Sequence, residues 1–309
     1  MLQAALVLLE TAVSDPHKRT GQAAILLELG IVAYGQGQHE TAEHYFEQSL
    51  LRCRLAGDRW GEANVLCELG VSAWSRGDYV AAAQRYEQSL TIRRALQDHV
   101  GTAIVLEGLA GTAMFAGDGE QAIAYTQQSL AVYQQLDDQV GTAVLQAELG
   151  HKNWYQHLTG IELIEDSLRI FADLGTRRHL AHWTVILAMY KSDVDITVGE
   201  RLAKEGLALC QEIGYQRGVG IAHGILSRAA WIAEDYDRAQ VLAQTYLRLT
   251  EEMSLLLERS DALTWSAWAY LAAGQWLRQR SGASHFSHAQ FVAGGGAQYC
   301  RHPVGASCP

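Results

Sequence analysis

The carboxyl-terminal tail holds the residue types best suited to metal chemistry. These residues are His285, His288, Cys300, His302 and Cys308, and imidazole nitrogens and thiolates are the ligands that zinc prefers. Their order, His-x2-His, then eleven residues, then Cys-x-His, matches no standard zinc module. The glycine run 294–296 beside them offers few side chains that could orient such ligands. We therefore expect no metal site and no cofactor.

Motifs for catalysis are missing from the sequence. It has no Gly-x-x-x-x-Gly-Lys-Ser/Thr phosphate loop, no Gly-x-Ser-x-Gly nucleophile elbow and no His-Glu-x-x-His pair. Glu28, Glu68 and Glu148 recur, which we interpret as the repetition of a larger unit and not as an assembled site. We expect a protein that is not an enzyme.

The strongest regularity is a spacing of 40 residues. The same residue types recur at Gly21, Gly61, Gly101 and Gly141, at Ala23, Ala63, Ala103 and Ala143, and at Leu29, Leu69, Leu109 and Leu149. Within each block, apolar residues fall three or four apart on both sides of a polar turn such as 76–79. This pattern is typical of two amphipathic helices. A period of this length predicts an all-α array of stacked helix-turn-helix units.

Two columns of small residues indicate where these helices cross. The first helices carry Gly30, Gly70, Ala110 and Gly150, and the second helices carry Ala42, Ala82 and Ala122. Because glycine inside a helix costs about 1 kcal/mol relative to alanine, its recurrence indicates that a large side chain would push the helices apart. The small residues Ser49, Ser89 and Ser129 of the second helices are expected to pack in the same way.

Together with the large residues around them, these columns resemble the tetratricopeptide repeat. The matching residues are Leu26, Leu29, Gly30, Ala42 and Phe46 in one block, and Leu66, Leu69, Gly70, Ala82 and Tyr86 in the next. The family's usual tryptophan and closing proline are missing, and the unit is about six residues longer than the commonest version. Long units of this kind are similar to the arrays of bacterial signalling ATPases and maltose-regulator-type activators. The resemblance implies a right-handed α-solenoid.

The repeat divides the chain into regular segments. We expect a half repeat at 1–20, repeats at 21–60, 61–100, 101–140, 141–178, 179–217 and 218–257, and a terminal helix at 258–273, all within one solenoid over 1–275. Helical patterning stops in 276–309, which we interpret as either a disordered tail or a change of reading frame. The terminal helix carries Leu263, Trp265, Trp268 and Leu271, so we expect self-association through it.

Charge and composition limit the partners. A net charge of −10 argues against direct binding of nucleic acid, which relies on cationic contacts with phosphates. The apolar amino terminus is interrupted by Glu10 and is too short to span a membrane. Five cysteines at unrelated positions favour a reducing cytoplasm over a disulfide framework. We interpret arginines near the ends of the second helices, such as Arg93 and Arg94, as a solvated face.

By resemblance, the first helices line a concave groove. Its residues here are Tyr34, Asn64, Trp74, Glu107, Phe115, His151, Trp154, Tyr155, His182, Arg228 and Trp231. A surface rich in aromatic rings suits an apolar peptide or helix, and Trp74, Trp154 and Trp231 are the expected anchors. The alternatives are that the rings only fill space between neighbouring first helices and that the two histidines are incidental.

The sequence therefore favours a scaffold that binds a protein or peptide segment in its groove. A second hypothesis is the sensor arm of a larger bacterial signalling ATPase or transcription regulator. The third is a regulator of the peptide-responsive phosphatase type, although the dedicated helical domain of those proteins is not recognisable in this sequence.

Overall fold

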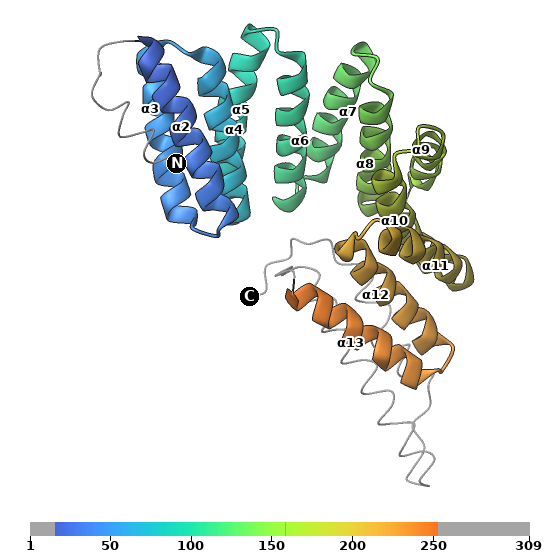
Figure 1. Cartoon of the computed structure of the whole chain (residues 1–309). Helices are drawn as coiled ribbons and strands as arrows, with labels where there is room; N and C mark the ends of the chain where they lie inside the picture. Colours follow the sequence, from blue (N-terminus) through green and yellow to red (C-terminus); the bar gives the residue numbers. More distant parts are fainter. Residues whose placement is uncertain (1–15, 158, 253–309) are drawn as a thin grey trace. The chain divides into compact units, whose positions relative to one another are not determined.

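The computed structural model describes residues 16–157 and 159–252. All regular secondary structure in these ranges is α-helical (Figure 1). The helices are α2 (Pro16–Gly35), α3 (His39–Ala56), α4 (Arg59–Ser75), α5 (Tyr79–Ala95), α6 (His99–Phe115), α7 (Gly119–Gln135), α8 (Gln139–His157), α9 (Ile161–Asp173), α10 (Arg177–Val194), α11 (Ile196–Glu212), α12 (Gln216–Ile232) and α13 (Tyr236–Glu252). Most of the half repeat at 1–20, the terminal helix at 258–273 and the 276–309 tail lie outside the described residues.

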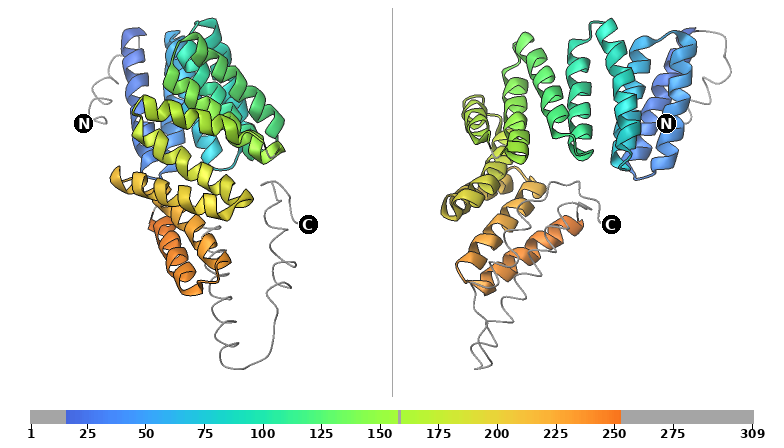
Figure 2. Two further views of the ribbon diagram at one scale, coloured as in Figure 1. Left: turned by 90° about the vertical axis from the view of Figure 1, so that its right-hand side faces the viewer. Right: turned by 180° about the vertical axis from the view of Figure 1, so that it is seen from behind.

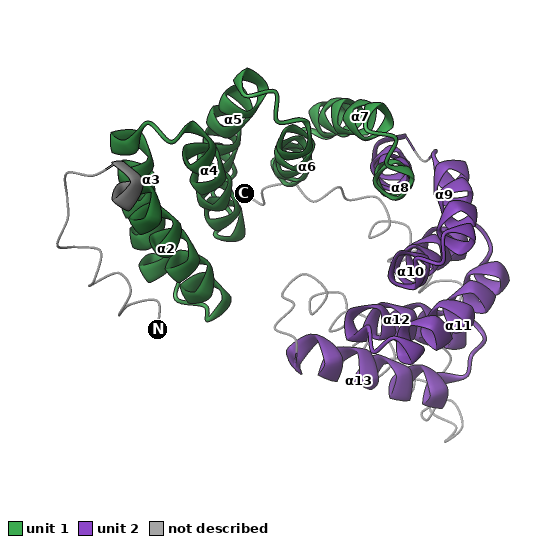
Figure 3. Ribbon diagram, turned by 45° about the horizontal axis from the view of Figure 1, so that its top comes forward, with its two compact units in different colours: residues 1–145, 303–309 green, residues 146–302 purple. Residues whose placement is uncertain are grey.

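Consecutive helices pair into hairpins, as the sequence predicts. Helix α2 packs on α3, α4 on α5, α6 on α7, α10 on α11 and α12 on α13, and Figure 2 shows the helices from the side and from behind. The chain divides into two compact units, the first ending at Leu145 and the second beginning at Gln146 (Figure 3). Within unit 1 the first helices α2, α4 and α6 also touch in order, and within unit 2 α10 touches α12. The all-α solenoid of helical hairpins is confirmed.

The recurring aspartates begin the helices. The Oδ1 atoms of Asp58 and Asp98 accept hydrogen bonds from the backbone N–H groups of Gly61 and Gly101, at 2.8 and 2.9 Å. Asp78 caps α5 in the same way. Because the first N–H groups of a helix have no partner inside it, a carboxylate at this position stabilises the helix start. The aspartates thus fix where α4, α5 and α6 begin, whereas α3, α10 and α12 begin without a side-chain cap.

The recurring glycines give room to large side chains of neighbouring helices. A methyl group at Gly30 would lie 2.4 Å from the ring of Phe46, and one at Gly70 would lie 2.7 Å from the ring of Tyr86. Another glycine column serves contacts between repeats, because a methyl group at Gly61 would lie 2.8 Å from Sγ of Cys53. The steric explanation of the glycine columns is confirmed.

The serine column combines close packing with a hydrogen bond. Ser49, Ser89 and Ser129 are fully buried. Their hydroxyl groups donate to the carbonyl oxygens of Ala23, Ala63 and Ala103, at 2.7, 2.7 and 3.2 Å. Each bond joins the second helix of a hairpin to its first helix. The expected packing role is confirmed, and the hydrogen bond explains why the small residue is a serine.

Arg93 corrects the expectation of a solvated arginine face. Its neighbour Arg94 is exposed as expected, but Arg93 is only 7% exposed. The guanidinium group donates to Asp98 Oδ2 at 2.6 Å and to Asn64 Oδ1 at 2.8 Å. It fits there because Gly101 has no side chain, and a methyl group at that glycine would overlap the Arg93 guanidinium. The error arose because a position near a helix end also faces the next repeat.

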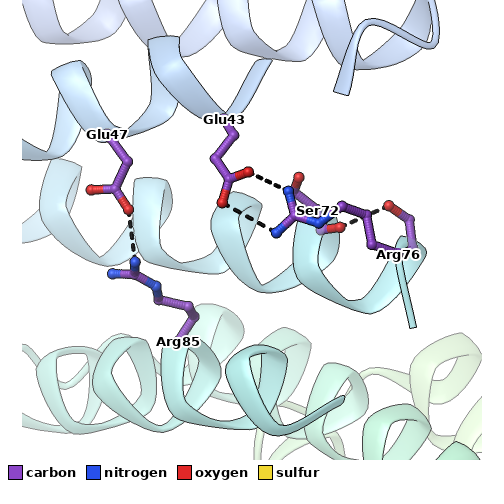
Figure 4. Close-up of polar contacts among 6 residues, drawn as sticks. Glu43, Glu47, Ser72, Arg76 and Arg85 are labelled. Atoms are coloured by element: carbon purple, nitrogen blue, oxygen red, sulfur yellow. Dashed lines mark hydrogen bonds and ion pairs between the residues drawn. The ribbon is translucent and has the colours of Figure 1, made fainter. Parts of the chain in front are cut away.

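Partly exposed ion pairs of unit 1 join α3 to the next hairpin (Figure 4). Arg76 binds Glu43, and Arg85 binds Glu47 at 2.7 Å. The Arg85 pair joins second helices of successive repeats, and Arg238 and Glu200 form a similar pair at 3.2 Å in unit 2. Such partly exposed pairs stabilise the fold weakly, but the arginines that form them already have an acidic partner.

None of the described helices combines the length and apolarity that a membrane-crossing helix requires.

Candidate functional site

The first helices of unit 1 share a side that lies outside the buried core of their hairpins. We call this side the unit-1 face. It is made of Ala24, Glu28, Ile31 and Gly35 on α2, Asn64, Glu68, Val71 and Ser75 on α4, and Ile104, Gly108, Gly111 and Phe115 on α6, all exposed or half-buried. Ile31 is 39% exposed and Ile104 is 48% exposed. The opposite side of the same helices forms the hairpin core, with Ala23, Leu26, Leu66 and Leu106 buried.

The predicted aromatic residues of unit 1 lie at the border of this face. Tyr34, Trp74 and Phe115 are half-buried. The Trp74 and Phe115 rings meet edge to face with centroids 5.2 Å apart, and Tyr79 stacks on Phe115 at 6.0 Å. These rings thus bridge successive helices and still keep part of their surface exposed. The rings thus fill space between neighbouring helices, and their role in binding a partner stays a prediction.

The two polar residues predicted in unit 1 are engaged inside the unit. The side-chain oxygen of Asn64 accepts a hydrogen bond from Arg93. The Glu107 carboxylate accepts one from the Ser129 hydroxyl at 3.4 Å. Since these atoms already have partners, we expect Asn64 and Glu107 to position their helices more than to contact a ligand.

Glu28 and Glu68 are the acidic residues of the unit-1 face. The pKa of Glu68 is raised above its ordinary value, mainly because the carboxyl group is desolvated by burial and also because the negative charge of Glu28 is close. The recurrence of these glutamates was interpreted from the sequence as repetition alone. The structure adds that repetition places them on the exposed side of adjacent helices.

In unit 2 the predicted residues His151, Trp154 and Tyr155 gather around a buried ring that the sequence analysis did not single out, Tyr190. The Tyr190 hydroxyl is hydrogen-bonded to Nδ1 of His151, and its ring lies 5.1 Å from that of Trp154 and 6.2 Å from that of Tyr155. Tyr155 is 50% exposed. Tyr155 is thus the open edge of a largely buried cluster.

The two predicted histidines meet through another residue that was missed, Trp183. Its buried ring lies 6.3 Å from His151 and 5.1 Å from His182. His182 Nδ1 lies 3.1 Å from the hydroxyl of Tyr215. Tyr190 and Trp183 were missed because a helical period marks apolar positions without showing which lie beneath the predicted residues. The only available signal was their aromatic type.

Burial lowers the pKa of both histidines. The pKa of His151 is lowered to about 3, mainly by desolvation and then by the charge of Lys152. The pKa of His182 is lowered to about 4, again mainly by desolvation and then by the charge of Arg217. Both imidazoles are therefore neutral at physiological pH. A neutral histidine buried against aromatic rings serves packing and hydrogen bonding better than recognition of a carboxylate.

The remaining predicted residues, Arg228 and Trp231, lie on α12. Arg228 is ion-paired with Asp193, and the half-buried ring of Trp231 packs against the cluster of Ala230, Ala239 and Ala243. Within residues 16–157 and 159–252, no three His, Cys, Asp or Glu side chains gather closely enough to hold a metal ion. The predicted residues thus fall in both units, five of them in unit 1 and six in unit 2.

Comparison with known proteins supports the repeat assignment. The sequence profile of the Tetratricopeptide repeat family matches residues 21–95. No curated protein sequence gives a significant match. The resemblance that the sequence suggested is confirmed, and the profile match falls in the region where the 40-residue period is clearest.

Several solved structures share the fold. Aspartyl phosphate phosphatase F from Bacillus subtilis has a TM-score of 0.63 and 12% identity, over 91% of this chain and 77% of that one. The Rap conjugation gene regulator of the plasmid pLS20, in complex with the Phr* peptide, has a TM-score of 0.53 and 11% identity, over 90% and 80%. A signal transduction ATPase with a tetratricopeptide repeat sensor from Pyrococcus horikoshii has a TM-score of 0.56 and 11% identity, over 87% of this chain and only 43% of that one. At such identities the likeness concerns the fold.

Proposed function

We propose that this chain is a binding scaffold whose first helices receive a peptide segment of a partner protein, and that it acts without catalysis. The observation that carries the proposal is the unit-1 face, where Ile31 and Ile104 are well exposed and the Trp74 and Phe115 rings stay half-open. Exposed apolar and aromatic side chains on a rigid element offer a partner large contact areas at a small cost in conformational entropy.

The similar structures support a peptide as the partner. One of them is the Rap regulator in complex with the Phr* peptide, and it shares the helical repeat with this chain. The likeness to the sensor-bearing ATPase, of which this chain spans less than half, supports the alternative of a sensor arm in a larger regulator. A phosphatase-type regulator is the third candidate, because aspartyl phosphate phosphatase F shares the fold.

We also propose that the protein works in the cytoplasm. The described cysteines Cys53, Cys67 and Cys210 are buried free thiols, and burial raises the pKa of each to about 11. Thiols of this kind pack as small apolar side chains and suit a reducing compartment.

A peptide selection tests the binding function. The full chain is immobilised, a displayed library of random peptides is selected on it, and the recovered peptides are synthesised and measured by fluorescence anisotropy. Trp74→Ala should weaken the binding of a recovered peptide by about 2 kcal/mol or more if the ring is an anchor. Trp60→Ala is the matched control, because Trp60 is 60% exposed on the same helix but lies outside the unit-1 face.

Two results would oppose the proposal. One is that no peptide is recovered above background. The other is that Trp74→Ala, Trp154→Ala and Trp231→Ala all bind recovered peptides as tightly as the unmodified chain does. Circular dichroism of each variant shows whether lost binding comes from lost helicity, in which case Trp74→Phe replaces the alanine variant.

A further inference from the structure

The arginines of unit 1 whose side chains the structure describes are engaged by other residues, and among them Arg93 reaches the unit-1 face, where it donates to Asn64. Arg76 and Arg85 pair with glutamates of α3 (Figure 4), Arg54 and Arg59 pair with Glu62, and Arg93 is buried. No lysine or arginine occurs in the sequence between Arg94 and Lys152, a range that includes all of α6 and α7. The residues that make up the face thus include two carboxylates and no lysine or arginine.

Glu28 and Glu68 supply that negative charge from adjacent helices. They occupy equivalent positions of successive repeats on α2 and α4, which are in contact. Neither carboxylate has a hydrogen bond or an ion pair with another described residue. The partial burial of Glu68 and the closeness of the two like charges disfavour its ionised form. A cation bound beside the two carboxylates would replace part of the solvation that Glu68 loses by burial, and it would offset the repulsion between the two negative charges.

Apolar surface flanks the two glutamates. Ile31 on α2 and the half-buried Val71 on α4 each lie one helical turn beyond a glutamate, and Ile104 is exposed on α6. Gly111 on α6 leaves open space, because a methyl group there would meet no other atom within 4 Å. The face thus offers room for apolar side chains next to a place for a positive charge.

We propose that the unit-1 face binds a peptide segment in which lysine or arginine stands beside apolar residues, and that Glu28 and Glu68 receive its cationic group. This inference rests on the proposed function and names the chemistry of the partner. A bare metal ion fits less well, because within the described residues no third acidic, histidine or cysteine ligand lies close to the pair. A small amine would leave the flanking apolar surface uncovered, whereas a peptide covers both.

The same peptide library tests the inference. Peptides recovered on the unmodified full chain should be richer in lysine and arginine than those recovered on a Glu28→Gln/Glu68→Gln variant. For one synthetic peptide from the first selection, Glu68→Gln should raise the Kd by about tenfold or more. Replacing the lysine or arginine of that peptide by glutamine should have a similar effect. The two changes together should cost little more than either alone, because they remove the same contact.

Glu87→Gln is the matched control, since Glu87 is exposed on α5 of the same repeat but belongs to a second helix. It should leave the Kd nearly unchanged, and added salt should weaken peptide binding to the unmodified chain more than to the Glu68→Gln variant.

Other outcomes would contradict the inference, and they differ in what they imply for the proposed function. Recovered peptides that bind tightly but lack basic residues, or that bind the Glu28→Gln/Glu68→Gln variant equally well, overturn the inference and leave the binding function intact. An equal loss in Glu87→Gln and Glu68→Gln also overturns it, because it indicates attraction by overall charge alone. If no peptide binds at all, both the inference and the proposed function fail.

Discussion

Tyr86 on α5 occupies the space that a side chain on Gly70 of α4 would need. A methyl group at Gly70 would lie 2.7 Å from Cε1 of the tyrosine ring, and one at Gly108 of α6 would lie 2.8 Å from the same atom. One ring therefore fits against glycines of two successive repeats. Because Tyr86 is only 5% exposed, the ring has little freedom to move away from an added methyl group.

Gly70→Ala should destabilise the protein. Alanine improves helix propensity by up to about 1 kcal/mol, but the overlap with the Tyr86 ring costs about 1–3 kcal/mol. The midpoint of urea unfolding, followed by far-ultraviolet circular dichroism, should therefore fall.

Gly111→Ala is the matched comparison for Gly70→Ala. It adds the same methyl group to a helix at a place with no neighbour within 4 Å, so its unfolding midpoint should rise or stay unchanged. If both variants shift in the same direction, the steric account of the glycine column is wrong.

The fold could be predicted from the sequence because several repeats carry the same residues at equivalent positions. The aspartates at the helix starts, the paired columns of glycine and alanine, and the buried serines all recur with the 40-residue period. Their roles are local or lie within one hairpin, such as the bond from Ser89 to the carbonyl oxygen of Ala63. A pattern of this kind needs no knowledge of distant contacts to be read correctly.

The candidate site was harder to predict because neighbouring residues of a helix point about 100° apart. The sequence favoured the column of Tyr34, Trp74 and Trp154 for its ring types, and the structure shows these rings half-buried. The residues that directly follow two of these rings are more exposed: Ser75 is exposed and Tyr155 is 50% exposed. Which side of a first helix stays open depends on how successive hairpins pack.

Arg93→Met should cost about 1–3 kcal/mol of stability, the range for leaving a buried polar group without its partner, because the Asp98 carboxylate is partly exposed and keeps some solvation. The change keeps an apolar stem of similar length but removes the donors to Asp98, Asn64 and Ser89. The Asn64 side chain then loses its partner, and Asp98 keeps only its role as a cap of α6. The urea midpoint of the full chain measures the loss.

Arg94→Met is the control for this prediction. Arg94 is exposed and donates to Gln128 at 3.1 Å, so its replacement should change the stability by less than about 0.5 kcal/mol. Similar losses for the two variants would mean that the contacts of Arg93 are no more important than those of a surface arginine.

The histidine cluster of unit 2 should make stability depend on pH. The pKa values of His151 and His182 are lowered from the ordinary 6.5 to about 3 and about 4. Between these values and 6.5 the unfolded chain binds more protons than the folded one. The stabilisation is therefore complete above about pH 6.5 and is lost as the pH falls towards 4 and 3. Glu68, whose pKa is raised, acts in the opposite direction and stabilises the fold as it becomes protonated.

The melting temperature, measured from neutral pH down to about pH 4, separates the effect of the histidines from that of Glu68. The unmodified chain should lose stability over this range, and His182→Gln should lose less, because its side chain cannot be protonated there. His151→Gln gives a second test at the Tyr190 contact, and His99→Gln is the control, since His99 is exposed at the start of α6. If the melting temperature falls equally with pH in the unmodified chain, His182→Gln and His151→Gln, groups other than these histidines cause the loss of stability in acid.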